Sequence, residues 1–388
     1  MRPPLIVLLA ASTLANTCSI GAFPSLLPEI ARDGALPDWQ VGIFAGAFGF
    51  ARMVADLPAG LFVARRLAAA LILGQVGLAG GALVIASSDA FPLLFAGRVV
   101  MGVGHALNML GGLTAILQVY AGRRLSVALN AVEFSAMIGL LGGAALVALL
   151  PGGIPWKTVL LLSCGPLLLA FALLPAVIAR LPRRGERLAV TAASSAAPVV
   201  TRPSLTPLAF AAGAAVAVAY ASIEQLVIPV RGSREFGLDR AQIAQIFMLS
   251  QACDIAALLP VGMLADRIGA VRVLVGVTFT MAVATLLIAF APLGGVVVGA
   301  VLFGMAMAGW MIPLSVLRQS TPPALVAWRT SLYRVGVDGG MFIGPFLAGV
   351  VGGPHLALVV FALLVVGTWL AWGSRGRRAA LQPVQYPP

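Results

Sequence analysis

The sequence predicts an all-α membrane protein in which twelve transmembrane helices form two parallel six-helix repeats. Three observations predict this fold: the composition, a series of long apolar runs and an internal repeat. Of the 388 residues, 60% are hydrophobic and 10% are charged, and the mean hydropathy is +1.03. A soluble domain carries about 25% charged residues, so this composition excludes a soluble globular protein.

Apolar runs long enough to span a bilayer, which takes about 20 residues, recur along the chain. Short breaks rich in Gly, Pro and Arg separate them. The first run is too long for the apolar core of a signal peptide, and no small-residue cleavage site follows it, so it is predicted to be an uncleaved helix. In order, the runs cover residues 5–30, 39–64, 68–88, 91–117, 126–150, 157–179, 207–230, 242–265, 271–291, 294–317, 328–351 and 355–373.

One connection between these runs is long. Residues 180–206 are polar and rich in Arg, Ser, Ala and Pro, which is typical of a flexible linker. We therefore expect an N-terminal six-helix bundle (1–179), a cytoplasmic linker (180–206) and a C-terminal six-helix bundle with a short basic tail (207–388).

The basic residues predict the orientation. Of the 25 Lys and Arg residues, 17 fall on one side of the membrane if both termini share that side. By the positive-inside rule this side is the cytoplasm, so we expect a multi-pass protein of the bacterial cytoplasmic (inner) membrane. The net charge of +12 then needs no nucleic-acid partner. The other eight basic residues are Arg32, Lys157, Arg231, Arg234 and Arg240 in outer loops and Arg52, Arg98 and Arg334 within helices.

Several kinds of chemistry are not expected. The three cysteines lie inside apolar runs, which argues against a disulfide framework. The chain has two histidines, no phosphate-binding glycine loop before a lysine and no cluster with metal-ligand spacing. We expect no enzyme activity, no cofactor and no metal, and we expect a monomer.

The chain repeats itself at an offset of 202 residues. Asp56-Leu-Pro-Ala-Gly-Leu-Phe aligns with Leu258-Leu-Pro-Val-Gly-Met-Leu, and the same offset pairs Gly102 with Gly304 and Gly142 with Gly344. Six helices per repeat make the halves parallel, related by an axis along the membrane normal. Such proteins bind their substrate near the midplane, between the halves.

Three motifs resemble those of the major facilitator superfamily. The first is Gly262-Met-Leu-Ala-Asp266-Arg267-Ile-Gly269-Ala-Val-Arg272, which is similar to the family's loop signature. The second is Leu94-x-x-x-Arg98-x-x-Met101-Gly102, which is similar to its arginine motif. The third is Gly340-x-x-x-Gly344-Pro345, which is similar to the glycine–proline motif of drug exporters. The chain is identified as a member, closest in motifs to the drug/metabolite:proton antiporter branches.

The sequence departs from these motifs in three places. The first-half copy of the glycine–proline motif, Gly139-Leu-Leu-Gly142-Gly143, lacks the proline. The first-half copy of the loop signature has Ala64 instead of the acid, and Ala15 stands where proton-coupled drug exporters often have Asp. The resemblance implies that Asp266 pairs with Arg267, Arg272 or Arg318 and stabilises one gating state, and that Arg98 handles protons or substrate.

Ionisable residues inside the predicted helices are functional candidates, because a charge in the bilayer costs several kcal/mol unless it is paired or hydrated. Arg52 and Asp56 lie four residues apart, as do Arg334 and Asp338. In the superfamily fold the helices that carry these two pairs pack against each other. A rise of about 1.5 Å per residue then places Arg52 level with Asp338 and Asp56 level with Arg334. We expect either a two-rung charge ladder that closes the inner gate or pairs within each helix.

Two acids, Glu133 and Asp254, are expected on the other contact line between the halves. Two carboxylates in a dry site cannot both ionise easily, which suits proton coupling; alternatively, Glu133 bonds to Asn130 or to the facing helix. We also expect Glu224 to serve as the acidic partner of Arg98. The candidates for proton coupling are Glu133, Asp254, Glu224 and Arg98.

Further polar residues could line the central cavity. His105 could relay protons, although a lone histidine on a packed face is more often structural. The cavity candidates are Asn16, Asn108, Tyr220, Gln225, Gln251 and Trp310.

Together these features predict a secondary active transporter that moves a small molecule by alternating access. Proton-coupled efflux is the leading hypothesis. One alternative is a proton-coupled importer of a small organic anion or metabolite. An alternative of another class is a non-transporting membrane sensor.

Overall fold

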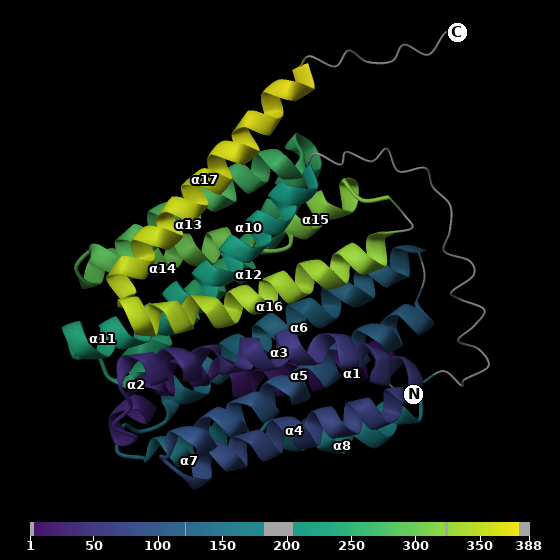
Figure 1. Ribbon diagram of the computed structural model, residues 1–388. Coiled ribbons are helices and arrows are strands. Elements are labelled where there is room, and N and C mark those ends of the chain that lie inside the picture. The colour runs from purple at the N-terminus through teal and green to yellow at the C-terminus, as the bar shows by residue number, and fades with distance from the viewer. Residues whose placement is uncertain (1–3, 121, 182–204, 323–324, 380–388) are drawn as a thin grey trace.

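The computed structural model describes residues 4–120, 122–181, 205–322 and 325–379, and the regular structure within these ranges is helical (Figure 1). The N-terminal half contains α1 (Leu5–Gly21), α2 (Phe23–Asp33), α3 (Asp38–Arg65), α4 (Leu67–Ser87), α5 (Phe91–Val119), α6 (Gly122–Leu149), α7 (Trp156–Ser163) and α8 (Leu167–Ile178).

The C-terminal half contains one π-helix among its α-helices. Its elements are α10 (Thr206–Ala219), the π-helix η2 (Tyr220–Val227), α11 (Ile228–Phe236), α12 (Arg240–Ile268), α13 (Ala270–Phe290), α14 (Leu293–Met307), α15 (Ile312–Gln319), α16 (Val326–Val351) and α17 (Gly353–Ala379).

Twelve described segments are long and apolar enough to cross a membrane, and one coincides with each predicted run. The prediction of an all-α fold with twelve membrane-spanning helices is therefore confirmed. Large apolar side chains such as Leu168, Leu259 and Trp369 are exposed on the outside of the bundle. An apolar surface of this extent is typical of a protein that faces lipid.

Four of the spans are broken into shorter helices: α1 with α2, α7 with α8, α10 with η2 and α11, and α14 with α15. In each of these spans one break lies next to a proline, namely Pro24, Pro166, Pro229 and Pro313. Proline has no backbone N–H and clashes with the preceding turn, so it interrupts the α-helical hydrogen bonds. The apolar runs of the sequence predict continuous spans at these positions.

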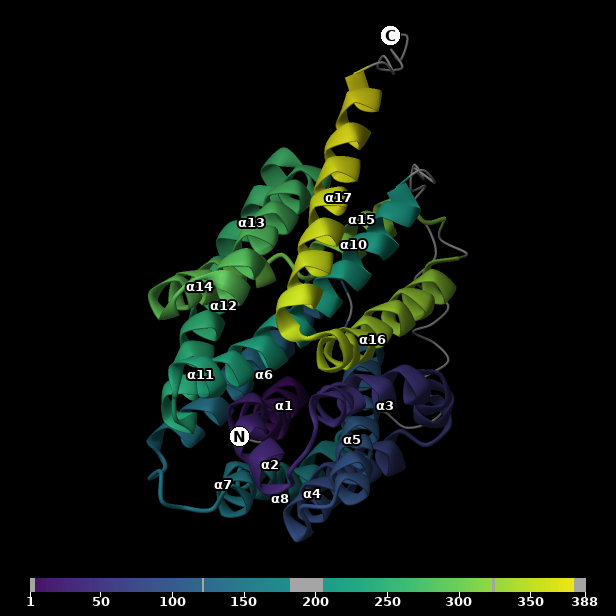
Figure 2. The same cartoon turned by 60° about the vertical axis from the view of Figure 1, so that its left-hand side comes forward.

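The two halves meet along two lines, where α3 packs against α16 and α6 packs against α12 (Figure 2). We call these lines the α3–α16 seam and the α6–α12 seam. The "linker end" of the bundle is the end at which α8 finishes and α10 begins. The "far end" is the opposite one, with α2, α7 and α11, on the left of Figure 1.

Part of the expected organisation lies outside the described residues. This applies to 182–204, most of the expected linker, and therefore to Arg183, Arg184, Arg187 and Arg202; it applies also to Arg2. The boundaries 1–179, 180–206 and 207–388 stay a prediction.

Candidate functional site

Glycines bring α3 and α16 into direct backbone contact toward the far end. A Cβ atom on Gly46 would lie 2.8 Å from the carbonyl oxygen of Phe342, and one on Gly49 would lie 2.8 Å from the Cβ of Met341. A Cβ on Gly42 would overlap the carbonyl oxygen of Pro345. The seam can close here only because these positions carry no side chain.

Two ion pairs continue this seam toward the linker end. Nη2 of Arg52 lies 2.8 Å from Oδ1 of Asp338, and Nε of Arg334 lies 3.1 Å from Oδ2 of Asp56. Each acid is thus bound by the arginine of the other half, not by the one on its own helix. The Asp338 side chain is only 1% exposed. The structure brings together the four residues of the expected ladder, and their role in gating stays a prediction.

Three carboxylates gather where α6, η2 and α12 meet. Glu224 is fully buried and accepts a hydrogen bond of 2.8 Å from Oγ of Ser250. Asp254 is 5% exposed and lies close enough to Glu224 and Glu133 for their charges to act on it. Glu133 is exposed although it also senses the charge of Arg52. It therefore faces accessible space near the middle of the bundle.

Arg98 lies between two aromatic rings. Its guanidinium carbon is 3.4 Å from the ring centroid of Phe23 and 4.9 Å from that of Phe48, an arrangement that stabilises a cation over the π-face. The residue is 3% exposed, and among the described residues nothing accepts a hydrogen bond from its Nε or Nη1.

The expected pair of Arg98 with Glu224 is not formed. Glu224 accepts its hydrogen bond from Ser250 on the facing α12, and the rings of Phe23 and Phe48 hold the guanidinium of Arg98. His105 lies against Phe48, with ring centroids 5.2 Å apart, and its Nδ1 is buried without a partner among the described residues.

The expected cavity residues fall into two groups. Asn16 and Gln251 are buried, and each has a side-chain oxygen with no hydrogen-bond partner in the described part of the chain. Such atoms normally bind water or a ligand. Tyr220 accepts a hydrogen bond of 2.7 Å from Gln225.

The other two cavity candidates take different positions. Asn108 lies against Gly74 of α4, where a Cβ would be 2.6 Å from Cγ of Asn108. The missing side chain of Gly74 thus makes room for Asn108 within the N-terminal half. Trp310 occupies the break between α14 and α15 and packs against the apolar core.

The loop motif forms the turn between α12 and α13. Gly269 has φ 93° and ψ 141°, a conformation that favours glycine, and Arg272 donates to the carbonyl of Ile268 at 3.2 Å. Gly262, Asp266 and Arg267 are exposed. Among the described residues no ion pair joins Asp266 to Arg267 or to Arg318, and the expected pairing of this acid stays a prediction.

Two ion pairs that were not predicted from the sequence join the halves at the far end. Arg234 of α11 binds Asp38 of α3 at 2.7 Å, and Arg240 of α12 binds Glu29 of α2 at 3.1 Å. Arg240 is 3% exposed and also donates to the carbonyl oxygens of Ile154 and Pro151.

One signal in the sequence could have pointed to these pairs. The outer loops hold nearly equal numbers of basic and acidic residues, and each of the five basic ones is paired in the structure.

Comparison with known proteins agrees with this architecture. Three solved structures align over nearly the whole chain. The nucleoside transporter NupG is 15% identical, with 96% of this chain and 99% of that chain covered and a TM-score of 0.71. A POT family transporter in complex with a thioalcohol-conjugated peptide is 13% identical, with 96% of each chain covered and a TM-score of 0.77. The human organic anion transporter MFSD10 is 17% identical, with 95% and 100% covered and a TM-score of 0.64.

At such low identity these likenesses show the fold alone. No curated protein sequence matches the chain closely enough to count as a relative. The family model described as Major Facilitator Superfamily matches residues 9–232 and 205–386, which together span almost all of the sequence. The chain therefore belongs to the Major Facilitator Superfamily, a family of multi-pass membrane transporters.

Proposed function

We propose that this transporter is a secondary active carrier that exports a small molecule by alternating access and takes up protons in exchange. The observation that carries the proposal is the group of three carboxylates, Glu133, Glu224 and Asp254, between the halves. We further propose that it acts as a monomer in the bacterial cytoplasmic membrane with both termini in the cytoplasm, which the bias of the basic residues supports.

The acidic group suits proton binding because, in the part of the chain that the structure describes, none of Arg52, Arg98 and Arg334 forms an ion pair with it. In the described structure, Arg52 and Arg334 are bound to acids of the α3–α16 seam, and Arg98 lies over Phe23. Neighbouring carboxylates repel one another when ionised, and a proton relieves that repulsion. Glu133 is exposed, so it receives the proton first. The buried Asp254 and Glu224 lie where α12 contacts η2, so protonation of this group changes how these two helices pack.

The α3–α16 seam supplies the moving contact. In the proposed cycle the pairs Arg52–Asp338 and Asp56–Arg334 hold the halves together on the cytoplasmic side of the glycine contacts, and they separate when the cavity opens inward. In this structure these pairs and the far-end pairs are formed together. This corresponds to a state in which the halves are in contact both at the far end and along the charged part of the α3–α16 seam.

A second candidate function is proton-coupled import of a small organic anion. The observation that favours it is Arg98, whose buried guanidinium keeps Nε and Nη1 without an acceptor among the described residues. Guanidinium groups bind carboxylates and phosphates through such N–H groups. The buried unpaired oxygens of Asn16 and Gln251 add positions at which a substrate could donate hydrogen bonds.

Purified protein in liposomes with an imposed pH gradient tests the proposal. A pH-sensitive dye inside the vesicles reports proton movement when drugs, sugars, organic acids, nucleosides or peptides are added. Export by exchange predicts that one class moves against the proton flow, whereas import predicts that protons and substrate move together. If no class moves with the gradient, the protein is a facilitator or a sensor and the proposal fails.

Two variants connect the result to the acidic group. Asp254→Asn and Glu133→Gln should abolish proton-driven accumulation and leave substrate exchange at equal pH intact. Asp33→Asn is a matched control, because this acid is exposed at the far end and pairs only with its neighbour Arg32. If Glu133→Gln and Asp254→Asn keep the full dependence on the pH gradient, the carboxylates have another role.

A further inference from the structure

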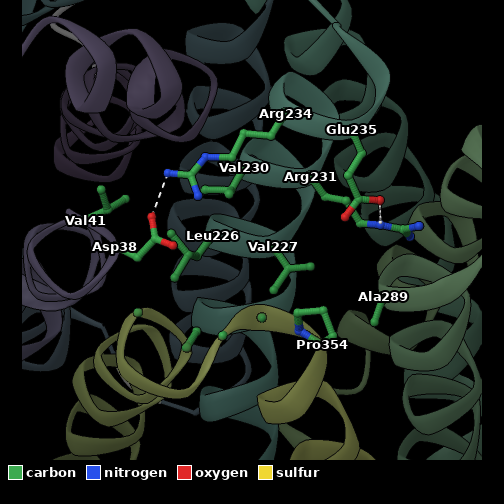
Figure 3. Close-up of a pocket in the computed structure, with 14 residues that line it drawn as sticks. Asp38, Val41, Leu226, Val227, Val230, Arg231, Arg234, Glu235, Ala289 and Pro354 are labelled. Atoms are coloured by element: carbon green, nitrogen blue, oxygen red, sulfur yellow. Dashed lines mark hydrogen bonds and ion pairs between the residues drawn. The ribbon is translucent and has the colours of Figure 1, made fainter. Parts of the chain in front are cut away.

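A pocket of about 230 Å³ opens at the far end of the bundle, away from the carboxylates and the charge ladder (Figure 3). Its apolar lining includes Leu226, Val227 and Val230. On one side of these residues lies the Asp38–Arg234 pair, and on the other side lies the Arg231–Glu235 pair. A volume of this size suits a small metabolite.

The walls of the pocket come from both halves of the protein. Asp38 and Val41 belong to α3, whereas the rest of the lining belongs to η2, α11, α13, α16 and α17 and to Gly352 between the last two helices. The two sides are held together by the 2.7 Å contact of Arg234 with Asp38 and by the close approach of Gly42 to Gly349, where an added Cβ would lie 3.0 Å from the neighbouring Cα. The complete pocket therefore exists only while the far end is closed.

The polar groups of the pocket can receive both a cation and an anion. Arg234 and Asp38 are 52% and 61% exposed, and in the described structure their contact uses one nitrogen, Nη2, and one oxygen, Oδ1. The remaining N–H groups of Arg234 can bind a carboxylate, and Oδ2 of Asp38 can bind an ammonium. By contrast, Arg231 is 12% exposed and already donates to Glu235 and to the carbonyl of Ile288, so it fixes the wall of the pocket.

The charges of the lining cancel, since two arginines face two acids. A lone anion or a lone cation would meet one group of its own sign beside each favourable partner. A molecule that carries an ammonium and a carboxylate on the same carbon satisfies Arg234 and Asp38 together, and an apolar side chain then covers Leu226, Val227 and Val230.

We propose that this pocket binds a small zwitterionic amino acid with an apolar side chain, and that the bound molecule holds the far ends of the two halves together. Its carboxylate binds Arg234 of one half and its ammonium binds Asp38 of the other. Because the pocket is complete only when the far end is closed, the ligand shifts the population toward that state. It acts as an effector outside the transport path, and this second part rests on the alternating-access mechanism proposed above.

Binding is measured on the purified full-length protein in detergent, by calorimetry and thermal shift, with leucine as the ligand. Isocaproate lacks only the ammonium of leucine, and isopentylamine lacks only the carboxylate. We expect both to bind at least about tenfold more weakly than leucine, which corresponds to about 1.4 kcal/mol each. Equal binding of the three molecules, or no binding of leucine at millimolar concentration, overturns the proposal.

Variants place the binding in this pocket. Arg234→Gln should weaken leucine binding at least about tenfold, and Val230→Trp, which fills the pocket, should abolish it. Arg32→Gln is the matched control: Arg32 is also an exposed far-end arginine in an ion pair, but with its neighbour Asp33 and outside the pocket. Leucine binding that survives both Arg234→Gln and Val230→Trp, or that Arg32→Gln weakens equally, contradicts the assignment.

The effect on conformation has its own readout. Spin labels at Gly153 and Gly294, two exposed far-end positions in different halves where a side chain meets no neighbour within 4 Å, report the distance between the halves. Leucine should shift the distance distribution toward the shorter, closed form. If leucine binds and the distances do not change, the pocket is a binding site, but the part of the proposal in which the ligand stabilises the closed state is wrong. Neither readout requires transport, so failure of the transport assay leaves the binding result intact.

Discussion

The two seams between the halves differ in how their charges are compensated. Along the α3–α16 seam, glycines allow backbone contact and two arginines bind two acids across the interface. Between the described side chains of α6 and α12, no hydrogen bond or ion pair crosses the other seam. The charge of Glu133 on α6 acts on Asp254 of α12, and neither acid forms an ion pair with a described basic residue of these two helices.

The difference suggests a division of labour. A buried charge that is paired stabilises one arrangement of the halves, and removing one partner is strongly destabilising. A buried acid without a basic partner costs free energy when ionised and gains from a proton. We infer that the paired charges of the α3–α16 seam hold the two halves together, and that the acids of the α6–α12 seam bind the proton.

The largest effect on stability and transport is expected at the buried Arg52–Asp338 pair of the charge ladder. Asp338→Asn leaves the buried Arg52 without its acid, so the free energy of unfolding should fall by about 3–5 kcal/mol and transport should be lost. Thermal unfolding and liposome transport measure the two effects. The exchanged pair, Arg52→Asp with Asp338→Arg, should regain part of both. An exchanged pair no better than the single variants would rule out the ladder.

A somewhat smaller loss is expected where α3 touches α16. Gly42→Leu places a side chain against the carbonyl of Pro345, and such overpacking typically costs about 1–3 kcal/mol; it should also hold the far end open. Gly60→Leu is the control on the same helix, since its added Cβ meets nothing within 4 Å. Accessibility of a cysteine placed at the far end measures the opening. Equal accessibility in the two variants would show that the glycine contact does not set the closed state.

The far-end pairs should differ from each other because one is buried and the other exposed. Arg240→Ala leaves Glu29 and the carbonyls of Ile154 and Pro151 without their donor, a loss of about 1–3 kcal/mol. Arg234→Ala removes an exposed pair, which contributes about 0–1 kcal/mol. Thermal unfolding of both variants checks the order. A larger effect of Arg234→Ala would mean that burial does not decide the strength of these contacts.

The smallest change in stability is expected at the acidic seam. Asp254→Asn removes a buried acid that has no basic partner on the facing helix, so the free energy of unfolding should stay within about 1 kcal/mol or rise, while proton-driven transport disappears. The comparison with Asp338→Asn is the decisive one, because both variants neutralise a buried aspartate. If the two variants destabilise the protein equally, the seams do not differ in the way described above.

Much of the fold follows from local properties of the sequence. Apolar runs locate the twelve spans because a bilayer demands about 20 apolar residues for each crossing. The repeat at 202 residues relates the halves. The four-residue spacing of Arg52 with Asp56 and of Arg334 with Asp338 places two rungs one helical turn apart on each helix, and the structure pairs them across the seam.

The sequence by itself determined the number of spans and which charges lie within them, because hydropathy and spacing are properties of single segments. Only the tertiary structure decided the partners: Ser250 for Glu224, the ring of Phe23 for Arg98, Gly74 for Asn108, and Glu29 for Arg240. These contacts depend on the rotation of each helix about its axis and on proline breaks that redirect the spans. Both are settled by packing among segments that are distant in the chain.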